Sequence, residues 1–357
     1  MAPVMQTRNR NGREPEGSGP GSGAARSRLK RILKPALKLA FTALLLALLY
    51  RKVDGRAFGD ALRGIRWAWV PGFFAIAFAN MWLSSLRWRL LLRSDGVDIP
   101  ACKLFASHWI ASFFNFFLPS NIGGDVYRIA DVGKKSGSAV GSLASVFVDR
   151  LCGFLALSLL GFAFPVLGLR LVPPEKRGLL LVPLAVFLGF LCVAALLWQQ
   201  GFVRFCARVL PGRLRAKVEA LLDTFFASVS AYLRRPRALA GAFALSLVFQ
   251  LLVFVAVWCV CRALSIPVSL AECCVFVPFV CLLEAVPLTV NGIGLRDSGY
   301  AMFFAAVGLA GRGADPATAA AALSLCYMAF TLAYALGGGL LFLRRLFAVP
   351  EPTRTSV

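Results

Sequence analysis

The sequence predicts an all-α polytopic membrane protein with about six transmembrane helices and two re-entrant helical hairpins, arranged as an inverted repeat. The chain of 357 residues is 59% hydrophobic and has a mean hydropathy of +0.73. Several apolar runs approach the ~20 residues needed to cross about 30 Å of hydrocarbon. Two shorter apolar segments are broken by glycine and proline, which favours hairpins that enter the bilayer without crossing it.

The chain divides into a basic tail, a membrane domain and a short end segment. Residues 1–28 are rich in Gly, Ser, Pro and Arg, which predicts a disordered tail and no signal peptide. The membrane domain is predicted over residues 29–345, and residues 346–357 form a C-terminal tail. The predicted spans are Leu33–Tyr50, Trp67–Leu86, Ala139–Leu169, Leu179–Trp198, Ala238–Cys261 and Ala317–Leu343.

The two hairpins are predicted where apolar segments meet helix breakers. Leu104–Leu118 runs into LPSNIGGD, and Cys273–Val286 runs into PLTVNGIGLRDSG before a further apolar piece, Gly299–Ala310. Non-helical backbone at membrane depth must face protein or a watery cavity, because unpaired N–H and C=O groups are costly in lipid. The residues expected to shape the hairpin backbone are Pro119, Gly123, Gly124, Pro287, Gly292 and Gly294.

The hairpins share the pattern P-x4-G-x3-R at an offset of 168 residues. The matched pairs are Pro119 with Pro287, Gly124 with Gly292, and Arg128 with Arg296. The same offset carries the span at Trp67 onto the span at Ala238. Repeat units are therefore predicted over residues 67–172 and 236–343, following the inverted-repeat plan of many transporters.

The distribution of Lys and Arg predicts that both termini are cytoplasmic. Residues 1–34 carry eight Lys or Arg, and the connections at 87–103, 125–138 and 199–237 are also basic. Residues 51–66 carry five and fall outside in this topology, against the rule. Residues 213–235 have an apolar face at helical spacing, which predicts an amphipathic helix, either on the cytoplasmic interface or packed on the bundle.

Composition also excludes several classes of function. The net charge of +22 lies mostly in the tail and short connections, which favours anionic lipid headgroups over nucleic acid. The ten cysteines lack metal-ligand spacing, and His108 is the only histidine, so we expect no metal and no cofactor. Trp88 is grouped with the tryptophans of an interfacial belt, and His108 is expected to face a neighbouring helix or the interface.

Several charged residues lie in or beside apolar runs. A charge at mid-helix costs ~2.5–3.5 kcal/mol on insertion scales, so these side chains must pair or line a water-filled path. Either they are ion pairs that lock the bundle, or arginines meet an anionic substrate at a helix N-terminus, held by Asp125 and Asp297. The candidate substrate-binding residues are Arg128, Arg150, Arg296, Asp125, Asp149, Asp297, Glu284 and Asn291.

Three segments resemble the lysylphosphatidylglycerol synthase transmembrane-region family. They are LPSNIGGDVYRIADVGKKSG, SVFVDRLCGF and EAVPLTVNGIGLRDSGYAMFF, and the resemblance covers about residues 33–345. It implies a flippase-like domain in a bacterial or archaeal cytoplasmic membrane. The chain departs from the family at Asn291, where glycine is usual, and at Asp297, where glutamate is usual. It ends about a dozen residues after the last span, so the soluble aminoacyltransferase domain and lysyl transfer are not expected.

These observations favour a translocase for an anionic or polyprenyl-phosphate-linked lipid. The alternatives are a membrane-embedded enzyme of polyprenyl-phosphate or glycolipid metabolism, and an accessory subunit whose buried charges are structural. No catalytic residue is assigned, because no acidic cluster of the D-x-x-D kind is present. Membrane lipids are the expected partners, and a homo-oligomer is compatible with the sequence.

Overall fold

A computed structural model describes residues 55–117, 123–168, 212–285, 292 and 294–347, with a few isolated positions between 174 and 192. Within these residues the secondary structure is helical throughout. The predicted span Leu33–Tyr50, nearly all of Leu179–Trp198 and both tails lie outside them. So do Pro119, Pro287 and Asn291, for which the sequence predictions stand as made.

Four of the predicted spans are confirmed as helices long and apolar enough to cross a membrane, counted over the described part of the chain. They are α3 (Val70–Ser94, preceded by the 3-10 turn η1, Trp67–Trp69), α6 (Ala139–Leu167), α10 (Pro236–Ala263) and α13 (Pro316–Phe347). The predicted end of the first of these at Leu86 was wrong, because α3 continues to Ser94. Arg87 suggested a loop there, but its guanidinium is buried against Asp149 and stays in the helix.

Two helical hairpins lie between the long helices. The first joins α4 (Ala101–Phe117) to α5 (Gly123–Ser136), and the second joins α11 (Leu270–Ala285) to α12 (Leu295–Ala306), which the 3-10 turn η4 (Leu309–Arg312) follows. Gly294 has φ +86°, a conformation that glycine adopts readily, and α12 begins at the next residue. The predicted apolar piece Gly299–Ala310 therefore started too late, since the stretch LRDSG is already helical.

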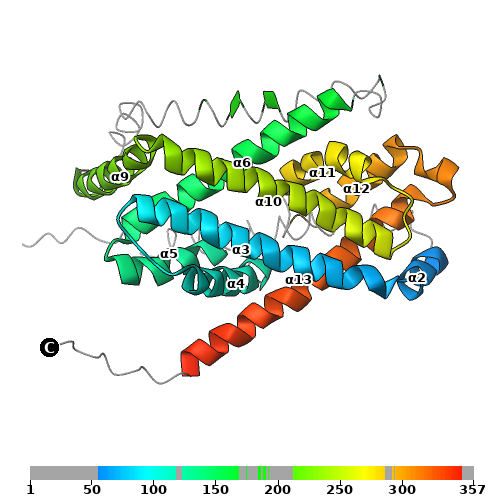
Figure 1. Cartoon of the computed structure of the whole chain (residues 1–357), viewed down its shortest axis with the longest axis horizontal. Coiled ribbons are helices and arrows are strands. Elements are labelled where there is room, and N and C mark those ends of the chain that lie inside the picture. Colours follow the sequence, from blue (N-terminus) through cyan, green and yellow to red (C-terminus); the bar gives the residue numbers. More distant parts are fainter. Residues whose placement is uncertain are drawn as a thin grey trace, which may run out of the picture.

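Helices α3 and α10 lie side by side and run in opposite directions (Figure 1). At one end the Arg66 amide donates to the Ala263 carbonyl at 2.8 Å. At the other end the Arg235 guanidinium lies 4.0 Å from the Asp95 carboxylate. Adding 168 to the bounds of α3 gives 238–262, close to those of α10, so the matched spans of the two predicted units are antiparallel.

The two predicted repeat units contribute one set of four helices each, α3 to α6 and α10 to α13. The last helix of each set packs on the hairpin of the other set. Helix α13 packs on α4, and helix α6 packs on α11. Both sets also show the same internal order of contacts, from long helix to hairpin to long helix. This exchange, with α3 and α10 antiparallel, is the arrangement that an inverted repeat requires.

Helix α9 (Gly212–Leu233) packs one face on α6 and α10. Phe226, Val229 and Tyr232 are buried there, while Leu221 is 56% exposed. Of the two interpretations of this amphipathic segment, the structure has the helix packed on the bundle. A shorter helix, α2 (Gly55–Arg63), contacts α13.

Helices α4 and α13 approach closely because α13 carries three consecutive glycines. A Cβ added at Gly338 would overlap the carbonyl oxygen of Trp109, and one at Gly339 would lie 2.6 Å from the Phe113 ring. The Trp109 indole donates to the Tyr334 carbonyl at 2.7 Å. Only a residue without a side chain allows this contact between the two sets of helices.

We expect Gly338→Ala to lower the thermal stability of the purified protein in detergent. The new methyl group must push α4 from α13, and overpacking of this kind typically costs about 1–3 kcal/mol. Gly59→Ala is the matched control, since it is also helical and an added Cβ meets nothing within 4 Å. Equal melting temperatures for the Gly338→Ala variant and the parent protein would contradict the close packing.

Candidate functional site

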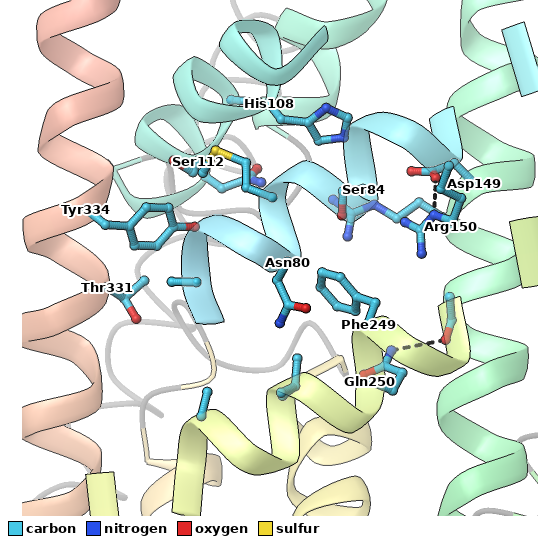
Figure 2. Close-up of a pocket in the computed structure, with 18 of the residues that line it drawn as sticks. Asn80, Ser84, His108, Ser112, Asp149, Arg150, Phe249, Gln250, Thr331 and Tyr334 are labelled. Carbon is cyan, nitrogen blue, oxygen red and sulfur yellow. Dashed lines mark hydrogen bonds and ion pairs between the residues drawn. The ribbon is translucent and has the colours of Figure 1, made fainter. Parts of the chain in front are cut away.

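A cavity of about 370 Å³ lies between the two sets of helices. Helices α3, α4, α5, α6, α10 and α13 all contribute to its wall (Figure 2). Its charged lining residues are Arg87, Asp125, Arg128, Asp149 and Arg150. Its neutral polar lining residues are Asn80, Ser84, His108, Ser112, Asn115, Gln250, Tyr327, Thr331 and Tyr334.

The charged end of the cavity is organised by Asp149. Asp149 is only 1% exposed, and its carboxylate accepts from Arg87 Nε at 2.5 Å and from Arg128 Nη2 at 3.0 Å. Asp149 lies on α6, a helix capped at its N-terminus by the Ser138 hydroxyl, which accepts from the Gly141 amide. Asp149 thus joins α6 to α3 and to α5.

Asp125 forms the outer half of the same cluster. Its carboxylate accepts from Arg128 Nη1 at 3.2 Å and from Arg150 Nε at 2.9 Å. The Arg150 side chain is 43% exposed, whereas that of Arg128 is 5% exposed. Within the described lining, three guanidinium groups face two carboxylates, which leaves one positive charge in excess.

Arg128 is fixed further by an aromatic ring. Its guanidinium lies 4.2 Å from the centre of the Trp88 ring, a cation–π distance. Trp88 is fully buried and its indole donates to Ser145 Oγ at 3.0 Å. The prediction that Trp88 belongs to an interfacial belt was therefore wrong, because the ring serves the cluster instead.

His108 packs edge-on against Trp88, with 5.2 Å between the ring centres. Its Nδ1 lies 3.1 Å from the Leu104 carbonyl and 3.4 Å from Ser85 Oγ. It faces a neighbouring helix, as expected, and it also lines the cavity. Its Nε2 is buried and has no hydrogen-bond partner among the described residues.

The N-termini of the two hairpin helices are capped by the protein's own side chains. The Gly124 amide at the start of α5 donates to Asn115 Oδ1 at 2.8 Å, and a Cβ there would overlap the Ala111 carbonyl. The Gly294 amide before α12 donates to Asp297 Oδ2 at 2.7 Å. Two of the amides expected to meet a phosphate are therefore already taken.

The second hairpin carries a separate and weaker cluster. Arg296 Nη2 donates to the Ser324 carbonyl at 3.3 Å, and its Nε lies 3.7 Å from Glu284 Oε1. The expectation that Asp297 holds the Arg296 fork was wrong, because the Asp297 carboxylate is used to cap α12. Arg296, Asp297 and Glu284 do not line the described cavity; Tyr327, which does, lies 5.7 Å from the Arg296 guanidinium.

Sequence reasoning missed the contribution of α3. Asn80, Ser84 and Arg87 follow one another at steps of four and three residues, which places them on one helical face toward the cavity. This spacing was the available signal. The spacing is hidden in the sequence because the charge of Arg87 favours a loop at residues 87–103.

The model of the family described as Lysylphosphatidylglycerol synthase TM region matches residues 36–339. The chain belongs to this family. No curated protein and no solved structure gives a significant match. The family and the four apolar helices make the chain a multi-pass membrane protein, and the match spans both hairpins and the whole cavity.

The described residues lack the arrangement that a metal site requires. Over the described ranges, no group of three or more His, Cys, Asp or Glu side chains is arranged to hold a metal ion. The two carboxylates that line the cavity, Asp125 and Asp149, instead contact arginines.

We expect Asp149→Asn to destabilise the protein strongly. Arg87 and Arg128 would lose their shared carboxylate, and breaking a buried ion pair typically costs about 3–5 kcal/mol. The measurement is thermal unfolding in detergent. Asp98→Asn is the control, since Asp98 pairs with Arg89 and Arg93 at the surface and such pairs contribute little. Similar losses in both variants would contradict the central role of Asp149.

Proposed function

We propose that this protein translocates an anionic or phosphate-linked lipid, whose headgroup passes through the cavity between the two sets of helices. The observation that carries the proposal is the cavity's cluster of three arginines and two aspartates, in which Arg87, Arg128 and Asp149 are buried and positive charge is in excess. A charge buried in an apolar bundle is costly, and it persists where it meets a partner or a polar pathway.

The hairpins support a transport role because they are too short to cross a membrane. At 1.5 Å per residue, the 17 residues of α4 span roughly 25 Å and the 12 residues of α12 roughly 18 Å. Since α3 and α10 are antiparallel, we infer that the two hairpins are re-entrant and enter the bilayer from opposite sides. Together with the predicted outer spans, this gives about six crossings.

We infer alternating access from the exchanged packing. Each hairpin contacts the last long helix of the other set, so movement of one set past the other would open the cavity to one side and then the other. In the opposite state, Arg296 would line the cavity as Arg128 does here. The basic connections favour a topology with both termini in the cytoplasm, and the family resemblance implies a bacterial or archaeal membrane.

The enzyme and accessory alternatives receive less support. Among the described lining residues, each carboxylate contacts two arginines, which leaves neither as a free base or nucleophile. A cluster that only locks the bundle requires no excess charge and no cavity of this size. We therefore assign no catalytic step.

Replacement of Arg150 by glutamine tests the proposal in proteoliposomes that carry fluorescent phosphatidylglycerol or a labelled polyprenyl phosphate. We expect headgroup movement to slow about tenfold or more, since a charge-assisted hydrogen bond contributes ~1.5–3 kcal/mol. Asp125 keeps Arg128 as a partner in this variant, so the fold should persist.

Arg93→Gln is the matched control, because Arg93 pairs with Asp98 at the surface and does not line the cavity. Both variants should melt close to the parent protein in detergent. Unchanged lipid movement in the Arg150→Gln protein would refute the site, and no movement of either lipid by the parent protein would count against translocation.

A further inference from the structure

The cavity has two chemically different ends, and we propose that they select a headgroup made of one phosphate ester bearing an uncharged polyol, such as glycerol or a hexose. Headgroups that carry an ammonium group are excluded. This inference names the substrate class of the cavity and rests on the proposed function.

The charged end suits a group with one negative charge. Arg150 extends into the cavity, and Arg128 Nε is buried without a hydrogen-bond partner among the described residues. A phosphodiester brings a single negative charge, which balances the excess of the cluster, and its oxygens accept from the planar guanidinium fork. The phosphate is thereby placed beside α6.

The opposite end is neutral and rich in hydrogen-bonding groups. In Figure 2, Ser112 of α4 and Thr331 and Tyr334 of α13 lie on the wall that faces Asp149 and Arg150 across the cavity. Asn80 lies between the two ends and points into the cavity (Figure 2). The Ser112 and Thr331 hydroxyls already donate to the Trp109 and Tyr327 carbonyls, at 2.6 Å and 2.7 Å, so their free lone pairs can accept from the hydroxyl groups of a ligand.

Asn80 is the strongest single indication of a hydroxylated ligand. The residue is 8% exposed, and its Oδ1 has no hydrogen-bond partner among the described residues. A buried amide without a partner is costly, and a ligand hydroxyl satisfies it whichever way the amide is turned. The cavity volume of about 370 Å³ lies in the range of small-ligand sites, so it can enclose a headgroup while the acyl chains remain outside.

An ammonium group finds no counter-ion here. Asp125 and Asp149 are the two carboxylates of the described lining, and each is already shared by two arginines. An amine would therefore enter a positively charged cavity and find both carboxylates occupied, which costs free energy. Ethanolamine and aminoacyl headgroups are excluded on this ground.

The first test is lipid binding to the purified protein in detergent, measured by native mass spectrometry. Phosphatidylglycerol and a polyprenyl phosphohexose are the polyol probes, and they separate a glycerol headgroup from a sugar headgroup. Phosphatidylethanolamine and lysylphosphatidylglycerol are the ammonium probes. We expect at least one polyol lipid to bind at least tenfold more tightly than both ammonium lipids. Equal or tighter binding of an ammonium lipid would overturn the inference.

The second test assigns the two ends of the cavity with variants. Thr331→Val keeps the side-chain shape but removes the hydroxyl, so the preferred polyol lipid should bind about threefold to tenfold more weakly. Phosphatidic acid, which has a phosphate and no polyol, should bind the variant as it binds the parent protein. Arg150→Gln should weaken both lipids. Equal weakening of both lipids by Thr331→Val would overturn the neutral end.

Transport is measured separately so that the two proposals can fail independently. Selective binding of a polyol lipid that is never moved in proteoliposomes would leave the headgroup selectivity standing and refute the translocase. Movement of an ammonium lipid in preference to the polyol lipids would uphold the translocase and refute the selectivity.

Discussion

Two of the buried arginines, Arg87 and Arg128, share the carboxylate of Asp149. Arg87 comes from α3 and Arg128 from α5, and the Asp149 carboxylate accepts from both, while Arg128 also contacts Asp125. Arg87 also donates to Ser246 of α10 at 2.9 Å, so the cluster reaches into the second set of helices. The wall of the cavity, and the position of the hairpin beside it, therefore depend on one carboxylate.

The two sets of helices make corresponding contacts, but their chemistry differs. The offset of 168 places Val255 opposite Arg87, and the eleventh residue is Asp149 in α6 but Cys326 in α13. Arg296 has no buried aspartate pair and relies on Glu284 and a helix carbonyl. Corresponding helices of the two sets make corresponding contacts, because these contacts depend on helix length, apolar surface and glycine packing. The ion cluster, in contrast, requires particular side chains. The charged lining residues of the cavity thus all come from α3, α5 and α6.

The sequence predicted the elements better than their contacts. Apolar length was enough for the four described spans, and glycine with proline was enough to expect the two hairpins, since both signals act locally. The prediction of where α3 ends was wrong because, in the sequence alone, a charged residue of a buried ion pair resembles a charged residue of a loop. The partner of Arg87, Asp149, is 62 positions away. The prediction for Trp88 was wrong for the same reason, because only the fold brings Arg128 over its ring. Asp125, Arg128, Asp149 and Arg150 were predicted, and the structure brings all of them to one cavity.

The capped helix ends change how an anion would be recognised. Asn115 and Asp297 use amides that a phosphate would otherwise meet, so recognition falls to side chains rather than to a helix terminus. The arginines divide this task. Arg128 is held by two aspartates and a tryptophan ring and fixes the site, whereas Arg150 is more exposed and is held by Asp125. When a phosphate attracts Arg150, Asp125 keeps its contact with Arg128. In the proposed translocase, an anion would therefore enter and leave without exposing an unpaired buried charge, as release of the headgroup requires.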